Sequence, residues 1–217
     1  GDQSADFEME MWNADGTRSE MCGNGMRCVG KYVYDKGYTN KLHLRIETLS
    51  GIRTLNLQVT DGKVDNVTVD MGKAAVQEDM RLLVDGAEAV CTPVTVGNPH
   101  AVLFVNDIDK VPLTTLGPKL ERHTAFPDGV NVEFVQVLGN NALRMRVWER
   151  GSGVTMACGT GACASVMAAI SKNYCCYDAP VAVHSDGGTL VIRIASDNTV
   201  TMTGPAEIVY EGETKLC

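Results

Sequence analysis

The chain opens with an alternation of hydrophobic and polar residues. Phe7, Met9 and Met11 alternate with Glu8 and Glu10, and a period of two residues is typical of a half-buried strand. An Asp-Gly pair at residues 61–62 predicts a hairpin between two later strands. From such patterns we expect strands at residues 7–12, 42–48, 52–59, 64–70, 90–96, 101–105, 130–138, 143–149, 181–184, 190–194 and 200–203.

Two segments carry a helical pattern instead, at residues 26–36 and 162–172. Each follows a Cys-Gly-x-Gly turn, and each turn follows a predicted strand. Because the order strand, cysteine turn, helix and further strands occurs twice, duplication of one unit is the economical explanation. Strands are too frequent for a doubly wound parallel sheet. The pattern therefore predicts an α+β protein of two pseudo-symmetric lobes.

The lobe boundaries follow from this repeat. We expect an N-terminal lobe at residues 1–72, completed by a C-terminal strand at residues 206–217, and a C-terminal lobe at residues 73–205. Each lobe is expected to be a strand-rich sheet wrapped around a central helix. The active site is expected in the cleft between the lobes, where ligand sites commonly occur.

Composition and charge limit the classes of function and partner that the chain can have. The 217 residues are 44% hydrophobic and carry a formal charge of −8, and no basic cluster offsets that charge, which argues against a nucleic-acid partner. No apolar run approaches a membrane span, and the first residues lack the apolar core of a signal peptide. The eight cysteines show no disulfide-framework spacing, so we expect a reducing cytoplasm.

Cys22 and Cys158, the cysteines of the two turns, are the candidate catalytic groups. A thiol at a helix N-terminus feels the partial positive charge of the exposed N–H groups, which favours the thiolate. The glycines let the backbone turn tightly, so the same N–H groups can face an anion. Two matched thiols suit a racemase or epimerase without a cofactor, in which one takes a proton and the other gives one.

The other cysteines have a simpler interpretation as small buried hydrophobic residues. This applies to Cys28, Cys91, Cys163, Cys175 and Cys176, whereas Cys217 is terminal. Neither a Cys-x-x-Cys nor a His-x-x-x-His pair is present, so the spacing does not support a metal site. A thiol-based redox protein remains an alternative, since two thiols facing one cavity could form a reversible disulfide.

Five ordered motifs resemble those of diaminopimelate epimerases, across essentially the whole chain. They are Asn-Ala-Asp-Gly with Met-Cys-Gly-Asn-Gly-Met-Arg-Cys (residues 13–16 and 21–28), Gly-Asn-Pro-His-Ala (97–101), Val-Asn-Val (130–132), Trp-Glu-Arg-Gly with Ala-Cys-Gly-Thr-Gly-Ala (148–151 and 157–162), and Met-Thr-Gly-Pro-Ala (202–206). A single Cys-Gly-x-Gly turn carries little information, but the ordered set is specific.

The resemblance implies interconversion of LL- and meso-diaminopimelate, on the route to lysine and peptidoglycan precursors, without a cofactor and in a homodimer. By resemblance, Cys22 and Cys158 are the acid/base thiols, and His100 lies near the site. Backbone groups at Gly23, Asn24, Gly159 and Thr160 hold the reacting carboxylate, and Asn13, Asn98, Asn131, Glu149 and Arg150 recognise the substrate, mainly its distal end. An Arg for a carboxylate and a Glu with amides for an ammonium suit that zwitterionic end.

One difference from the family concerns the start of the sequence. The family begins with an additional segment of some tens of residues, whereas this sequence opens almost directly on the strand before Asn13. We therefore expect an incomplete first lobe with an unpaired strand edge. Two further alternatives stay open: an amino-acid racemase similar to proline racemase, and a truncated chain that binds its ligand without turnover.

Overall fold

The computed structural model describes residues 5–12, 16, 18, 22–139 and 141–213. The chain divides into two compact units, of which unit 1 comprises Gly1–Val69 and Gly204–Cys217 and unit 2 comprises Asp70–Thr203. The chain leaves unit 1 within strand β4 (Lys63–Lys73) and returns to it within strand β14 (Thr199–Pro205). The expectation from the sequence placed these boundaries at residues 72/73 and 205/206.

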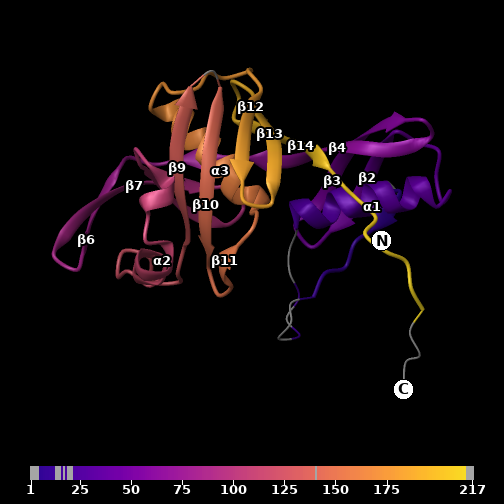
Figure 1. Ribbon diagram of the computed structural model, residues 1–217. Coiled ribbons are helices and arrows are strands. Elements are labelled where there is room, and N and C mark those ends of the chain that lie inside the picture. Colours follow the sequence, from indigo (N-terminus) through magenta and orange to yellow (C-terminus); the bar gives the residue numbers. More distant parts are fainter. Residues whose placement is uncertain (1–4, 13–15, 17, 19–21, 140, 214–217) are drawn as a thin grey trace. The chain divides into compact units, whose positions relative to one another are not determined.

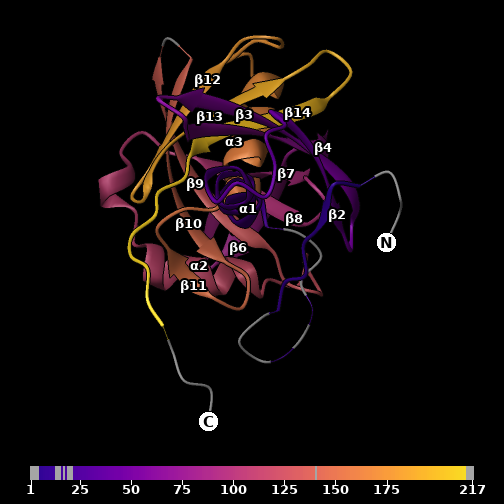
Figure 2. The ribbon, with the colours of Figure 1, turned by 90° about the vertical axis from the view of Figure 1, so that its right-hand side faces the viewer.

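Unit 1 combines a small sheet with one helix. Strands β1 (Phe7–Glu8), β2 (His43–Thr48), β3 (Gly51–Thr60) and β4 are hydrogen-bonded in that order, with β1 parallel to β2 and the other pairs antiparallel. Helix α1 (Gly23–Asp35) packs against β3, and Figure 2 looks along its axis. A Cβ atom at Gly30 would lie 2.9 Å from a methyl group of Leu57, so the glycine lets the helix pack closely against the sheet.

Unit 2 is a larger sheet built around helix α3 (Gly159–Ser171). Its strands run in the order β14-β13-β12-β10-β9-β8-β7-β5, with β11 added to β10 and β6 added to β7. The remaining bounds are β5 (Ala75–Val76), β6 (Met80–Val84), β7 (Ala87–Thr95), β8 (Pro99–Phe104), β9 (Asn131–Gly139), β10 (Ala142–Glu149), β11 (Gly153–Thr155), β12 (Val181–Ser185) and β13 (Gly188–Ile194). Pairs β8/β9 and β10/β12 are parallel.

Helix α3 is the centre of unit 2. It packs against strands β5, β7, β8, β9, β10, β12 and β13, several of which are seen in front of it in Figure 1. Every residue from Gly161 to Ile170 is buried, and a helix that is apolar on all sides belongs in the interior of a domain. This enclosure places the N-terminus of α3, with Cys158, inside unit 2.

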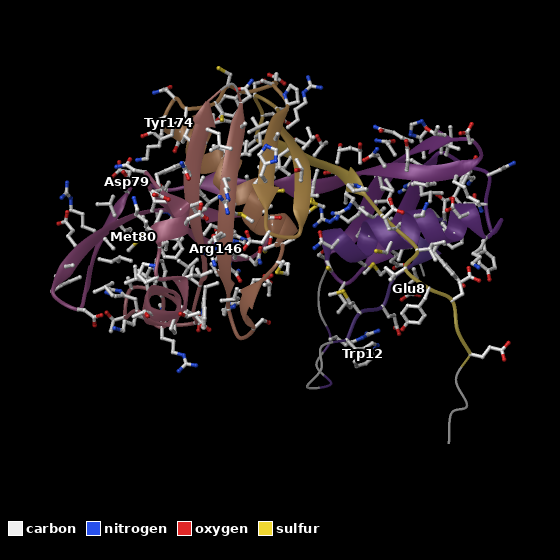
Figure 3. The ribbon with its side chains drawn as sticks, viewed as in Figure 1. Glu8, Trp12, Asp79, Met80, Arg146 and Tyr174 are labelled. Atoms are coloured by element: carbon white, nitrogen blue, oxygen red, sulfur yellow. The ribbon has the colours of Figure 1, made fainter. Side chains whose placement is uncertain are left out.

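A second core of unit 2 lies under helix α2 (Leu113–Glu121). Leu113 and Leu120 of the helix pack with Leu82 of β6 and Phe134 of β9. Asp79, labelled in Figure 3, lies directly before β6 and accepts a hydrogen bond from the Thr92 hydroxyl of β7 at 2.8 Å.

No helix among the described residues is long and apolar enough to cross a membrane.

The structure confirms the α+β class and most predicted strands, with three corrections. The expected strand at residues 7–12 is shorter, because β1 covers only Phe7–Glu8 and Trp12 forms an isolated bridge with Arg18. Residues 206–213 form no strand: β14 ends at Pro205, which has no N–H to donate, and residues 207–213 are exposed without a partner strand. Strands β5, β6 and β11 were not predicted.

Candidate active site

Cys22 and Cys158 occupy the same position in two helices. Cys22 is the N-cap of α1, with φ −133° and ψ 112°, and its sulfur accepts a hydrogen bond from the Gly25 N–H at 3.4 Å. Cys158 is the N-cap of α3, with φ −127° and ψ 115°, and its sulfur accepts from the Gly161 N–H at 3.3 Å. Each sulfur therefore does what the oxygen of Ser or Asp does at an ordinary N-cap.

The first residues of both helices provide backbone N–H groups for an anion. Gly23 and Asn24 open α1, and Gly159 and Thr160 open α3. The first N–H groups of a helix have no partner within the helix, and the helix dipole adds partial positive charge there. Neither helix has an acidic residue of its own in its first turn.

The surroundings of Cys22 are partly exposed and include a cation. The Arg27 guanidinium donates to Asn24 Oδ1 at 2.9 Å and to the Pro205 carbonyl oxygen at 3.0 Å, which holds it over the first turn of α1. Burial lowers the pKa of Arg27, and electrostatic interactions with Cys28 and Cys22 oppose this shift. A guanidinium stays charged in proteins, so Arg27 places a positive charge next to Cys22.

The surroundings of Cys158 are buried and acidic. The residue is only 7% exposed. Burial, together with the carboxylates of Glu133 and Glu149, raises the pKa of its thiol to about 12, although hydrogen bonds from Thr160 and Gly161 oppose this shift. The two thiols thus share one backbone geometry but differ in their electrostatic environment.

A chain of polar side chains leads from Cys158 into the core of unit 2. The Thr160 hydroxyl lies 3.5 Å from the sulfur and accepts from Asn98 Nδ2 at 3.3 Å. Asn98 Oδ1 lies 2.9 Å from His100 Nε2, and His100 Nδ1 lies 2.7 Å from Glu133 Oε1. His100 and Glu133 are fully enclosed, at 1% and 0% exposure. The predicted residues Asn98, His100 and Thr160 are therefore connected to Cys158.

Asn131 connects β8 to the end of β10. Its Nδ2 donates to the Pro99 carbonyl oxygen at 3.0 Å, and its Oδ1 accepts from the Arg150 N–H at 2.9 Å. Arg150 itself is exposed, and its guanidinium donates to the carbonyl oxygen of Asp128 at 3.2 Å. Asn131 therefore fixes the backbone from which Arg150 extends.

Glu121 holds the turn that follows β10. Its carboxylate accepts from Trp148 Nε1 at 2.6 Å and from the Gly151 N–H at 2.9 Å. Burial favours a raised pKa for Glu121, but these hydrogen bonds and the charges of Arg122 and Arg150 together outweigh burial, and the pKa is lowered. Gly117 lies under the Trp148 ring, where a Cβ atom would come within 2.6 Å. Glu149 and Arg150 thus lie between two fixed residues.

The predicted residues fall into both units. Cys22, Gly23 and Asn24 belong to unit 1, whereas Asn98, Asn131, Glu149, Arg150, Cys158, Gly159 and Thr160 belong to unit 2. Asn13 lies outside the described residues. Glu133 and Glu121 were not among the residues predicted from the sequence. A signal was available for Glu133, an acidic residue between Val132 and Phe134 in an apolar strand, because a buried carboxylate needs a specific partner.

The other described cysteines are free. Cys91, Cys163 and Cys175 are buried, as expected. Cys28 and Cys176 are exposed, which corrects their interpretation as buried residues. Cys28 lies on the solvent face of the amphipathic helix α1, and Cys176 lies in the loop after α3. Among the described residues, no group of three or more His, Cys, Asp and Glu side chains is placed to hold a metal ion.

Comparisons with known proteins agree on one family. The family model for diaminopimelate epimerase matches residues 1–77 and 92–209. A diaminopimelate epimerase from Acetivibrio thermocellus is 47% identical over 99% of this chain and 81% of its own length. A diaminopimelate epimerase from Phocaeicola vulgatus is 48% identical over 99% of this chain and 80% of its own length.

Solved structures of lower identity share the fold. A probable proline racemase from Agrobacterium radiobacter has a TM-score of 0.73 at 16% identity, covering 94% of this chain and 72% of its own. A hydroxyproline epimerase from Agrobacterium vitis has a TM-score of 0.74 at 20% identity, covering 94% of this chain and 70% of its own. From the family model and the two relatives, this chain belongs to the diaminopimelate epimerase family and is an isomerase.

Proposed function

We propose that this chain interconverts LL- and meso-diaminopimelate by proton transfer between two thiols, Cys22 and Cys158, with no cofactor. The observation that carries the proposal is the matched pair of N-cap cysteines, each with its sulfur at the mouth of a helix. Proline-racemase-like activity is the second candidate for the same chemistry. The relatives at 47–48% identity favour diaminopimelate, since the racemase and hydroxyproline epimerase structures share only 16–20% of residues.

The reaction balances with the two thiols alone. One thiolate removes the α-hydrogen as a proton, and the electron pair of the C–H bond moves into the carboxylate, giving an enediolate. The thiol on the opposite face then donates its proton to the carbon, and the electron pair returns to form the new C–H bond. The configuration is inverted, and the two sulfur atoms have exchanged protonation states, which prepares the enzyme for the reverse reaction.

The helix N-termini would stabilise the charge that develops in this reaction. The N–H groups of Gly23 and Asn24 in α1, and of Gly159 and Thr160 in α3, are the donors assigned to the reacting carboxylate. Fixed donors directed at a developing negative charge need no reorganisation during the reaction, which makes them effective in catalysis. Without pyridoxal phosphate, this backbone stabilisation replaces the electron sink that such a cofactor supplies.

Selectivity for diaminopimelate would come from residues around β10. We assign Arg150 to the distal carboxylate and Glu149 to the distal ammonium, with Asn98 and Asn131 lining the same region. Support comes from the turn geometry: Asn131 bonds the backbone N–H of Arg150, and Glu121 bonds the residues on either side of Glu149 and Arg150. Asn13, outside the described residues, completes the assignment by family resemblance alone.

The cellular context follows from the chemistry. The mechanism needs two reduced thiols, so we place the protein in the cytoplasm, where thiols stay reduced. A homodimer is proposed from family resemblance. The small-molecule substrate requires no nucleic acid or membrane partner.

Proton NMR in deuterated water tests the proposed function. LL-diaminopimelate is incubated with the reduced protein, and the α-hydrogen signals are followed over time. The proposal predicts deuterium at one α-carbon together with appearance of the meso isomer. L-Proline is the matched substrate control, because it has no distal amino-acid end. Exchange into L-proline without exchange into LL-diaminopimelate would overturn the substrate assignment and favour the racemase alternative.

A further inference from the structure

Glu133 is a fully buried carboxyl group with only one of its two oxygens in a hydrogen bond. One oxygen, Oε1, lies 2.7 Å from His100 Nδ1. The other, Oε2, has no hydrogen-bond partner among the described residues. The contact with His100 holds Oε1 in place. Both oxygens lie in the interior of unit 2, where screening by water is weak.

The carboxylate lies directly against the turn that carries Cys158. A Cβ atom at Gly161 would come 2.6 Å from Glu133 Oε1 and 3.2 Å from Cys158 Cβ. The position that a Cβ atom of residue 161 would take is therefore next to both the Glu133 carboxyl group and Cys158. Glycine is required in this helical turn because the Glu133 carboxylate occupies the space of a side chain.

Other ionisable groups face Cys158 as well. Glu149, at the end of β10, adds a second negative charge, and Cys163, one turn further along α3, is a buried thiol that interacts electrostatically with Cys158. His100, from β8, contacts Glu133 rather than the sulfur. The Thr160 hydroxyl and the Gly161 N–H act in the opposite sense, because both can stabilise a thiolate.

We propose that Glu133, fixed by His100, is a positioning residue whose charge keeps Cys158 in its protonated form in the resting protein. A negative charge close to a thiol disfavours a second negative charge. Cys22 has the opposite environment, with Arg27 beside it. The proposal rests on the proposed two-thiol mechanism, which requires one thiol to start with a proton: Cys158 is that thiol, and Cys22 starts as the base.

The test measures the thiol itself and needs no turnover, so its failure is separate from failure of the proposed function. The full chain is alkylated with iodoacetamide at pH 8 without substrate, and each cysteine is quantified by mass spectrometry. Glu133→Gln keeps the shape of the side chain and removes its charge. A decrease of about one unit in the pKa of Cys158 gives roughly tenfold more thiolate. Since a less basic thiolate is a weaker nucleophile, the net alkylation rate should rise about threefold.

The rate at Cys158 is expressed relative to Cys163, which is buried in the same helix. General loosening of unit 2 would raise both rates, whereas loss of the Glu133 charge acts on Cys158 and raises the ratio. Glu133→Asp shortens the side chain but keeps the charge, so its ratio should stay near that of the parent protein. Glu88→Gln, an exposed β7 glutamate paired with Arg81, is the control for charge removal in general.

Two results would overturn the proposal. One is a Cys158/Cys163 ratio in Glu133→Gln that equals or falls below that of the parent protein. The other is an increased ratio in Glu133→Asp, because that variant retains the charge. An increased ratio in the Asp variant would overturn the proposal even if the Gln variant does not fold.

Discussion

The N-termini of α1 and α3 have the same N-cap geometry but lie in two different environments. Both start with a cysteine in extended conformation whose sulfur accepts the N–H three residues later. Around Cys22 the surface is partly open and a guanidinium is fixed nearby. Around Cys158 the strands of unit 2 enclose the thiol, and two carboxylates act on it. Local sequence determines the cap, whereas tertiary packing determines how deeply each thiol is buried and which charged groups lie near it.

This difference has a chemical use. A two-base epimerase needs a thiolate and a thiol at the start of each turnover, and two identical sites would not distinguish them. Under the proposal above, unequal burial and unequal neighbouring charges keep the proton on Cys158 before substrate binds. The similar caps then allow each sulfur to take either role when substrate arrives, because each retains N–H donors that can stabilise the thiolate.

Among the changes at the two helix N-termini, removal of either thiol should have the largest effect, which is on the rate of turnover. Cys22→Ala and Cys158→Ala each remove a proton donor or acceptor, and a positioned acid or base contributes about 10²–10⁴-fold to the rate. We expect each variant to lose meso-diaminopimelate formation by at least this factor while substrate still binds. The measurement is kcat by NMR together with calorimetric titration of substrate.

The controls are Cys28→Ala in unit 1 and Cys176→Ala in unit 2, both exposed cysteines. Their kcat should equal that of the parent protein. Parent-level turnover in either Cys22→Ala or Cys158→Ala would show that a two-thiol mechanism is wrong.

The glycines that donate to the two sulfurs should differ in their tolerance of alanine. In Gly161→Ala, the Cβ atom would meet the pinned Glu133 carboxylate at 2.6 Å, and such overpacking costs about 1–3 kcal/mol. In Gly25→Ala, the nearest atom is the end of the flexible Met9 side chain at 2.8 Å. Both variants gain about 1 kcal/mol from the better helix propensity of alanine, which offsets the movement of Met9 in Gly25→Ala but only part of the clash in Gly161→Ala.

Urea denaturation measures this difference. The midpoint should fall clearly for Gly161→Ala and change little for Gly25→Ala. Equal decreases in the two variants would mean that the Glu133 carboxylate is not fixed at its position, and that the two caps are packed alike. An Ala substitution at Gly37, an exposed glycine with φ +77° after α1, provides a reference for backbone strain without a clash.

The features that the sequence predicted well are local. The Cys-Gly-x-Gly turns, the apolar strands and the hairpin at residues 61–62 depend on neighbours along the chain. Helix starts were misplaced by three residues, at Met26 and Ala162 instead of Gly23 and Gly159. The glycines suggested a turn before the helix, but they form its first helical turn, because the cysteine sulfur caps it.

The features that were not predicted from the sequence, or were predicted wrongly, depend on long-range contacts. Glu133 acquires its role only when parallel pairing of β8 and β9 brings His100 opposite Asn131, two residues away from Glu133 on the same strand. Glu121 lies 27 residues from Trp148, and its contact depends on how α2 packs. The strand expected at residues 206–217 failed in its described part for a related reason, since β-propensity alone does not provide a partner strand.

The smallest expected effect is a difference in how the two units respond to alkaline pH. Burial raises the pKa of Cys163 in unit 2, with a further contribution from Cys158. A thiol whose pKa is higher in the folded state holds its proton more tightly there, so its contribution to stability is complete below the unfolded pKa, about 8.5. The contribution is lost as pH rises towards the folded pKa, and each such thiol lowers the unfolding free energy by about 1 kcal/mol per pH unit in that range.

Cys163→Ala should therefore flatten the decline of stability between about pH 9 and 11, measured by urea denaturation at stepped pH. Cys28→Ala, at an exposed position of α1, should leave the slope unchanged; if both variants give the parent slope, burial of Cys163 does not control its ionisation.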